Sequence, residues 1–340
     1  MRIAINGFGR IGRSFLRVLL SDPKVREKIV VVAINVGGLD RKDTAHLFKY
    51  DTTMGQWKGK VAVEDDKLLI EGHIITLLAE RDARKLPWEK LEIDWVVDCS
   101  GKYTDAADAR QHLEAGAKKV LISAPATGPD CTIVPGVNDG AYDAKRDSII
   151  SLGSCTTNAL MPMLKVIIEE FGIERAVVVT THAYTNSQSL LDSGPLPDHD
   201  LRSYRAAPLN IIPHGTGASR LISEFFPQLD GRVSARALRV PVSNVSLLEV
   251  SWVAPREMHR EMVNEAFYNA AAKGSLRGIV ETSSEQLVSS DFIGDSASVI
   301  IDEGLTSVSG SLGTVFGWYD NEWGYSCRLR DFLMIIGPSC

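Results

Sequence analysis

The sequence predicts an α/β chain of two domains, a mostly parallel sheet covered by helices followed by an α+β domain with a largely antiparallel sheet. In the first 150 residues, runs of β-branched residues alternate with helical patterns. After residue 155 the strand runs follow one another, with two helical patterns placed to cover one face. The length of 340 residues suits two domains, at roughly 150 residues each. We expect residues 1–154 and 321–340 in the first domain, and 155–320 in the second.

The strands of the first domain are short β-branched runs bounded by turn residues. A helix is expected from Ile11 to Leu20, ended by Ser21-Asp22-Pro23. With the strands on either side it forms a βαβ unit. The expected strands are 2–6, 28–35, 61–63, 67–70, 74–78, 95–99, 119–123 and 148–151.

The first turn of this βαβ unit carries the pattern G-x-G-x-x-G at Gly7, Gly9 and Gly12. Such glycines permit a tight turn and let the backbone approach a pyrophosphate at the helix N-terminus. A lone match is weak, and the alternative is a structural glycine turn. This match directly follows a strand and opens a helix, which favours dinucleotide binding and a Rossmann-like, doubly wound first domain.

The second strand of a dinucleotide-binding unit usually ends in an acid that holds the adenosine ribose. Here Val36 stands at that point, and the first acid is Asp40, beyond two glycines. Arg41 and Lys42 follow and would attract a 2′-phosphate. This arrangement favours NADP over NAD. The alternative is that Asp40 folds back through the glycines and holds the ribose.

Cys155 lies between a strand ending near Ile150 and a helical pattern that Gly172 ends. A helix N-terminus stabilises a thiolate, the nucleophilic form of cysteine. The alternative is a buried, inert cysteine.

The elements after Cys155 begin with a strand at 176–181, which His182 follows, and a long polar segment at 187–207. Further strands are expected at 234–240, 245–253, 298–301 and 313–319, and helices at 210–225 and 259–272.

His182 stands where a strand end would reach a cleft. Alone it would more often be an ordinary core or surface residue, but near a helix-terminal cysteine it can act as acid and base. Hydroxyls, arginines and helix-start amides in the same half suit phosphate oxygens. They are Ser154, Thr156, Thr185, Arg202, Thr216, Gly217 and Arg239.

Composition and charge exclude several other classes. The net charge of −6 argues against nucleic acid as the main partner. No apolar run reaches the roughly 18 residues of a membrane span, and Met1 opens almost directly into a strand, so we expect a cytoplasmic chain. The five cysteines are widely spread, which predicts neither a disulfide framework nor a metal site.

Several motifs resemble those of the phosphorylating glyceraldehyde-3-phosphate dehydrogenases, from end to end of the chain. They are Ile5–Gly12, Ser154–Asn158, Thr181–Thr185, Asn210–Pro213, Arg239–Pro241 and Trp318–Ser326. The cysteine motif and the Trp-Tyr-Asp-Asn-Glu-Trp run are the most specific.

This resemblance implies a homotetramer that oxidises a phosphorylated aldehyde with inorganic phosphate and NAD or NADP. Cys155 would attack the aldehyde, and His182 would take the proton. Cofactor positions would be Arg10, Ile11, Arg81, Ser123 and Asn321. The substrate-phosphate site would include Thr185 and Arg239, and the inorganic-phosphate site Ser154, Thr156, Thr216 and Gly217, with Arg202 serving the region.

The chain departs from the family pattern in places. Val36 replaces the ribose-binding aspartate, Leu152-Gly153 an Asn-Ala pair, and His214-Gly215 a pair of small residues. The loop at 192–200, with its Gly-Pro-Leu-Pro segment, is expected to be longer than usual. Cys327 replaces an asparagine, and the chain ends at Cys340.

Two alternatives remain open. One is an erythrose-4-phosphate dehydrogenase, which hydrolyses its thioester; retention of Thr216-Gly217 favours the phosphorylating enzyme. The other is a catalytically silent relative with a binding role, against which Cys155, His182 and Arg239 all argue.

Overall fold

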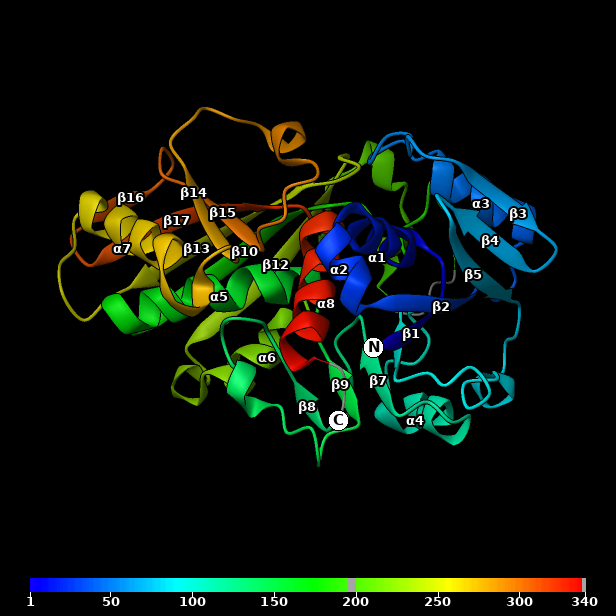
Figure 1. Ribbon diagram of the computed structural model, residues 1–340. Helices are drawn as coiled ribbons and strands as arrows, with labels where there is room; N and C mark the ends of the chain where they lie inside the picture. The colour runs from blue at the N-terminus through cyan, green and yellow to red at the C-terminus, as the bar shows by residue number, and fades with distance from the viewer. Residues whose placement is uncertain (195–199, 338–340) are drawn as a thin grey trace. The chain divides into compact units, whose positions relative to one another are not determined.

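The computed structural model describes residues 1–194 and 200–337, which form two compact units (Figure 1). The first unit contains residues 1–135, 139–153 and the described residues from Ser326 on. The second contains residues 136–138 and the described part of 154–325. The expected domain boundaries stay a prediction.

The sheet of the first unit has nine strands among the described residues, in the order β3-β4-β5-β2-β1-β6-β7-β9-β8. Every neighbouring pair is parallel except β3-β4 and β4-β5. The predicted mostly parallel sheet is confirmed. The strands are β1 (Arg2–Asn6), β2 (Val30–Asn35), β3 (Val61–Glu64), β4 (Lys67–Ile70), β5 (His73–Leu78), β6 (Trp95–Asp98), β7 (Lys119–Ile122), β8 (Cys131–Thr132) and β9 (Ile149–Ser151).

Three helices of the first unit, α2, α3 and α4, were not expected. Each follows an aspartate, Asp22, Asp40 or Asp105, whose carboxylate accepts the backbone N–H two residues later. This is a standard helix N-cap. Pro23 follows the end of α1 and starts α2, because proline suits the first helical position. Since α2 extends to Lys28, β2 begins at Val30 rather than at residue 28. The helices are α1 (Arg10–Ser21), α2 (Pro23–Lys28), α3 (Arg41–Lys49) and α4 (Ala106–Glu114), and α8 (Trp323–Ile336) continues into this unit from the second.

The strand order reverses at β1, since the chain runs outward through β2 on one side and through β6, β7 and β9 on the other. Parallel strands bring their carboxyl ends to the same edge of a sheet. Ligands of such sheets bind at that edge, next to the reversal. Asn6 and Asn35, which end β1 and β2, mark the place.

The sheet of the second unit has eight strands in the part that the structure describes, in the order β11-β12-β10-β13-β17-β15-β14, with β16 paired to β17. Only β10-β12 and β14-β15 are parallel among these pairs, so the largely antiparallel prediction is confirmed. The strands are β10 (Arg175–Ala183), β11 (Ile212–His214), β12 (Val233–Val240), β13 (Ser246–Val253), β14 (Val280–Ser283), β15 (Val299–Asp302), β16 (Ser307–Ser309) and β17 (Leu312–Tyr319).

The helices of the second unit are α5 (Cys155–Glu170), α6 (Ala218–Phe225) and α7 (Arg260–Ala272). α5 packs on β13, β15 and β17, α6 on β12, and α7 beside β14 (Figure 1). In the helical pattern expected at 210–225, Pro213 and Gly215 were expected to delay the start, and α6 begins at Ala218; the strand β11 at residues 212–214 was not expected. Pro213 lacks an N–H and suits this edge strand. No helix within residues 1–194 and 200–337 is long and apolar enough to span a membrane.

Candidate functional site

The glycine turn of the first unit is shaped by contacts that a larger residue would break. Gly7 has a φ of +93°, and a Cβ on Gly12 would lie 2.2 Å from the carbonyl oxygen of Gly7. Gly9 has no neighbouring atom within 4 Å of the place its Cβ would take. It caps α1 without a side-chain hydrogen bond. The turn therefore leaves open backbone at a helix start, which fits a pyrophosphate.

A pocket of about 250 Å³ lies at the carboxyl ends of β1, β2, β5 and β6. Of the predicted cofactor residues, Gly7, Gly9, Val36 and Arg81 line it. The remaining lining residues were not expected, although each follows or ends one of these strands. They are Asn6, Phe8, Asn35, Gly37, Gly38, Glu80, Cys99, Ser100, Lys102 and Tyr103.

The other predicted cofactor residues lie elsewhere. The Arg10 guanidinium pairs with Asp51, and Ile11 is half-buried in α1. The backbone N–H of Ser123 donates to the Asp98 carbonyl. Asn321 belongs to the second unit, where its side-chain oxygen accepts from Ser246 Oγ.

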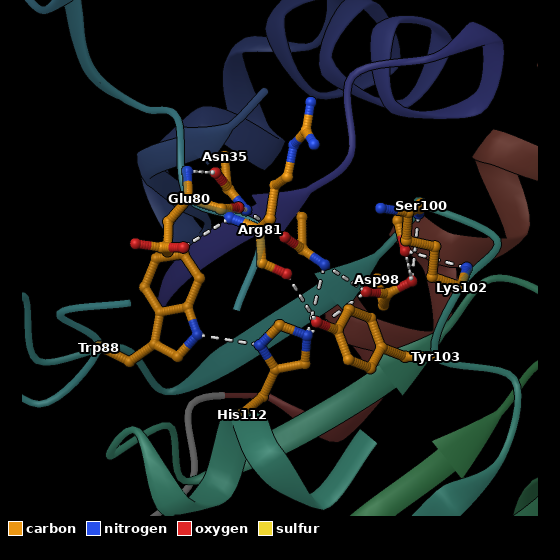
Figure 2. A network of polar contacts seen from close by, with 10 residues as sticks. Asn35, Glu80, Arg81, Trp88, Asp98, Ser100, Lys102, Tyr103 and His112 are labelled. Atoms are coloured by element: carbon orange, nitrogen blue, oxygen red, sulfur yellow. Dashed lines mark hydrogen bonds and ion pairs between the residues drawn. The ribbon is translucent and has the colours of Figure 1, made fainter. Parts of the chain in front are cut away.

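The charged residues that the sequence predicted near Val36 are not those that line the pocket. Asp40 does not fold back, because its carboxylate caps α3 by accepting from the Lys42 N–H at 2.8 Å. Arg41 and Lys42 are exposed at the start of α3 and do not line the pocket. The cations that do line it are Arg81 and Lys102 (Figure 2).

Glu80 is the acid of this pocket lining. Its Oε1 accepts the backbone N–H groups of Asp82 and Arg81, and these two bonds lower the pKa of the Glu80 carboxyl. The Glu80 carboxylate is therefore hydrogen-bonded to the backbone of its own turn, residues 80–82.

In the second unit, Cys155 is the first residue of α5. Ser154 caps this helix in a reciprocal pair with Thr157, whose N–H donates to Ser154 Oγ at 3.1 Å while Thr157 Oγ1 accepts the Ser154 N–H at 3.2 Å. This capping box fixes where the helix begins. Gly153, with a φ of +63° that glycine tolerates best, precedes the cap.

The Sγ atom of Cys155 lies 3.4 Å from Nε2 of His182, near the end of β10. His182 Nδ1 is 2.7 Å from the Ala183 carbonyl oxygen. A proton on Nδ1 would satisfy this carbonyl, which only accepts, and Nε2 would then present a lone pair to the sulfur. This is the geometry of a nucleophile and its base.

Arg239 lies beside His182 because β10 and β12 pair in register, His182 opposite Arg239. Its Nη1 is 2.6 Å from His182 Nδ1 and 3.2 Å from the Ala183 oxygen. Burial, followed by repulsion from this guanidinium, lowers the pKa of His182 to about 3. Burial raises the pKa of the Cys155 thiol, and the Arg239 charge offsets part of that rise. The ligand-free pair is therefore a neutral imidazole facing a thiol.

Tyr319 was missed as a site residue. Its hydroxyl lies 3.0 Å from Thr156 Oγ1 and 2.7 Å from Thr180 Oγ1, and burial raises its pKa. The only signal was its place in the Trp318–Ser326 motif.

Of the remaining predicted phosphate residues, Thr185 follows β10, Thr216 and Gly217 follow β11, and Arg202 lies in a short 3₁₀-helix, Leu201–Tyr204. Thr185 Oγ1 contacts Ser187 Oγ, and Arg202 forms an exposed ion pair with Asp200. Thr216 and Gly217 precede α6, which has no side-chain cap at its N-terminus. Among the described residues, no hydrogen bond joins these four to Cys155 or His182.

Some of the positions at which the chain departs from the family pattern lie among the described residues, and others do not. His214 ends β11 with Nδ1 2.7 Å from the Gly215 oxygen, and Cys327 is buried in α8. Pro195, Leu196, Pro197 and Cys340 lie outside the described residues.

Comparisons with known proteins bear on both units. Residues 1–106 match the family model of the glyceraldehyde 3-phosphate dehydrogenase NAD binding domain, and residues 154–321 that of its C-terminal domain. The chain is 46% identical to the glyceraldehyde-3-phosphate dehydrogenase of Streptomyces coelicolor over 338 residues, 99% of this chain and 98% of that protein. It is 45% identical to glyceraldehyde-3-phosphate dehydrogenase 2 of Bacillus subtilis over 335 residues, 98% of this chain and 96% of that protein.

The role of Arg239 can be tested by replacing it with leucine. Its charge holds down the pKa values of both His182 and Cys155, so both should rise in Arg239→Leu. At a fixed pH the variant then has less thiolate, and the pH profile of Cys155 alkylation by iodoacetamide should move to higher pH. NMR titration of labelled histidine measures the rise at His182.

The control is Arg236→Leu, on the same strand. Arg236 is exposed and donates to the Ala235 carbonyl, so its loss should leave both profiles unchanged. An Arg239→Leu profile that overlays the wild type would show that the guanidinium does not act on the pair.

Proposed function

The chain belongs to the glyceraldehyde-3-phosphate dehydrogenase family, and we propose that it oxidises glyceraldehyde 3-phosphate with inorganic phosphate and NAD(P)⁺ to 1,3-bisphosphoglycerate. The observation that carries this proposal is the 3.4 Å contact between Cys155 Sγ and His182 Nε2 at the start of α5. A half-buried thiol held against an imidazole nitrogen suits covalent catalysis on a carbonyl carbon.

We assign the covalent step and the proton transfers of the reaction to Cys155 and His182 of the second unit. Sγ of Cys155 bonds to the aldehyde carbon, and the thiol proton passes to the aldehyde oxygen to give a thiohemiacetal. His182 Nε2 removes the hydroxyl proton as the carbon loses its hydride, which leaves a thioester. A bound NAD(P)⁺ supplies the hydride acceptor. Phosphate then attacks the thioester carbon, and the acyl phosphate leaves as the thiolate of Cys155 is released.

Two phosphate groups must bind for this sequence, and Arg239 supports one of the sites. Its Nε is buried without a hydrogen-bond partner among the described residues, although the residue as a whole is half-buried, and a polar group withdrawn from water in this way is costly until a partner binds it. We assign Arg239 and Thr185 to the substrate phosphate. Inorganic phosphate would bind Ser154, Thr156, Thr216 and Gly217, using the start of α6, where the N-cap residue Gly217 brings no side chain; Arg202 would serve the same region.

The pocket of the first unit fits a dinucleotide, and its charges favour NADP. Gly9 leaves the backbone open where the pyrophosphate would lie. Val36 brings no carboxylate to the end of β2, and Asp40 is committed to capping α3. The Arg81 guanidinium lies over Gly38, where a Cβ would be 3.3 Å from its Nη2. A 2′-phosphate would meet cations here and no carboxylate at position 36.

A homotetramer in the cytoplasm is proposed from the family. Exposed apolar side chains between residues 190 and 211 support burial against another subunit, since such groups on a surface usually mark an interface. They are Leu190, Leu191, Leu201, Leu209 and Ile211, each more than 65% exposed.

Initial rates with two aldehydes test the proposed activity. Glyceraldehyde 3-phosphate should be the better substrate, and its turnover should require phosphate, because only phosphate gives the acyl phosphate. Erythrose 4-phosphate turned over faster without phosphate would indicate the hydrolysing relative instead. No turnover of either aldehyde, with Cys155 alkylated only as slowly as a free thiol, would indicate a binding role.

Cys155→Ser should abolish acyl-enzyme formation while cofactor binding persists, because a serine hydroxyl is a weak nucleophile at its ordinary pKa. Residual activity above about 1% would contradict the assignment. Cys131→Ser is the matched control. Burial raises the pKa of Cys131 to about 12, so its thiol is inert and its loss should leave the rate unchanged.

Val36→Asp should shift the preference towards NAD by about 1–3 kcal/mol, through a charged hydrogen bond gained with the ribose and a repulsion of the 2′-phosphate. The ratio of kcat/KM for NADP and NAD measures the shift. Ile74→Asp adds the same charge at an exposed position of β5 and should leave the ratio alone. An unchanged ratio in Val36→Asp would mean that another group sets cofactor choice.

A further inference from the structure

Behind the dinucleotide pocket lies a buried polar chain that the proposed mechanism does not use (Figure 2). The Trp88 indole N–H donates to His112 Nδ1 at 3.0 Å. His112 Nε2 is 3.4 Å from Oδ2 of Asp98. Trp88 and His112 are fully buried, and Asp98 is 2% exposed.

Trp88 determines which tautomer His112 adopts. An indole nitrogen is a donor only, so the ring nitrogen that accepts from it cannot carry a proton. The proton of a neutral His112 is therefore on Nε2, which lies 3.4 Å from Asp98 Oδ2 and 3.4 Å from Asn6 Nδ2. Because an amide nitrogen cannot accept this proton, Asp98 is the acceptor within reach.

Asp98 gathers donors from two residues that line the pocket. Its Oδ2 accepts from Asn6 Nδ2 at 2.5 Å, and its Oδ1 accepts the Ser100 backbone N–H at 3.1 Å and the Ser100 hydroxyl at 2.8 Å. The carboxylate thus accepts these three hydrogen bonds, and His112 Nε2 lies 3.4 Å from its Oδ2. A buried carboxylate needs such donors. If one donor is lost, the carboxylate can turn, and the remaining donors no longer meet it in the same geometry.

The chain continues to the next two strand ends through Asn35. The Glu80 backbone N–H donates to Asn35 Oδ1 at 3.0 Å, and Asn35 Nδ2 donates to Asn6 Oδ1 at 2.7 Å. A backbone N–H only donates, so it orients the Asn35 amide, which in turn orients Asn6 towards Asp98. The directions obtained from Glu80 and from Trp88 meet at Asp98 Oδ2, since Asn6 Nδ2 and His112 Nε2, 3.4 Å apart, are then both donors. One consistent chain thus joins the ends of β1, β2, β5 and β6.

His112 also supports the pocket through its ring face. The Tyr103 ring, part of the pocket lining, packs edge-on against His112 with ring centroids 4.9 Å apart. His112 and Trp88 themselves do not line the pocket. Their effect on a ligand can act only through Asp98, Tyr103 and the residues these hold.

We infer that His112, held in its Nε2-protonated form by Trp88, is a positioning residue for the dinucleotide: by orienting Asp98 it sets Asn6, Ser100 and Asn35 in the geometry the ligand meets. This inference rests on the proposed function, since it requires that the pocket bind NAD or NADP. A residue that served only to fill the core would affect stability without a selective effect on dinucleotide affinity.

The test compares His112→Phe, His112→Gln and Trp88→Phe in the full chain, by calorimetric titration with NAD⁺ and NADP⁺. Phenylalanine keeps a ring against Tyr103 and removes both polar contacts, so the Kd should rise about 10-fold, as for loss of a hydrogen bond to a charged group. Glutamine keeps one acceptor and one donor and should recover part of the affinity. Trp88→Phe should also raise the Kd, because His112 is then free to change tautomer.

Trp95→Phe is the matched control. Trp95 is also fully buried in the first unit, and its indole nitrogen has no hydrogen-bond partner among the described residues. The Trp95→Phe variant should lose thermal stability much as Trp88→Phe does, but its Kd for NAD⁺ and NADP⁺ should be unchanged. Iodoacetamide labelling of Cys155 should be normal in all four variants.

Equal Kd values for wild type, His112→Phe and Trp88→Phe would overturn the inference, as would an equal rise in Trp95→Phe. If His112→Phe does not fold, Trp88→Phe and His112→Gln decide. A ¹⁵N NMR shift showing a protonated Nδ1 on His112 in the wild type would also overturn it. Wild-type protein that binds neither dinucleotide would overturn the proposed function and this inference with it, whereas tight wild-type binding with unaffected variants would overturn the inference alone.

Discussion

The contact between Cys155 Sγ and His182 Nε2, 3.4 Å long, is the interaction on which the chemistry of the second unit depends. With the imidazole proton on Nδ1, towards the Ala183 carbonyl, Nε2 is the acceptor that faces the sulfur. The same geometry depends on strand pairing, because the register of β10 with β12 brings Arg239 against the ring. A shift of one residue would turn His182 to the other face of the sheet. The sheet is thus the support of the catalytic pair.

The pKa of the Cys155 thiol is higher than its place at a helix N-terminus alone would suggest. Charge effects at a helix end contribute about 0.3–1 kcal/mol, up to about 2 kcal/mol when partly buried. Burial is the largest influence on Cys155, and it raises the thiol pKa despite the helix N-terminus and Arg239. The sequence-based argument for a thiolate considered only the favourable contribution. It could not include burial, which depends on the packing of the whole unit.

What the sequence could predict was local. The turn at Gly7, the helix that follows it and the position of Cys155 at the first residue of α5 depend on patterns within about ten residues. α3 was missed although Asp40 is a good N-cap residue, because only Thr44 and Phe48 of its nine residues are buried, which leaves a weak helical period. Arg41 and Lys42 were expected near a 2′-phosphate for the same reason, but they lie at the start of α3 and do not line the pocket. Contacts such as Trp88 with His112, or Tyr319 with Thr156, join residues 24 and 163 positions apart, and no spacing rule reveals them.

Arg239 shows why a site of this kind is costly to the folded chain. Burial lowers the pKa of its guanidinium, its nearest partner is the neutral ring of His182, and among the described residues no carboxylate forms an ion pair with it. A chain selected for stability alone would pair or replace such a cation, since an uncompensated buried charge is strongly destabilising. An anionic ligand supplies the missing partner, and the charge then contributes to binding. The structural cost and the capacity to hold a phosphorylated substrate therefore arise from the same unpaired group.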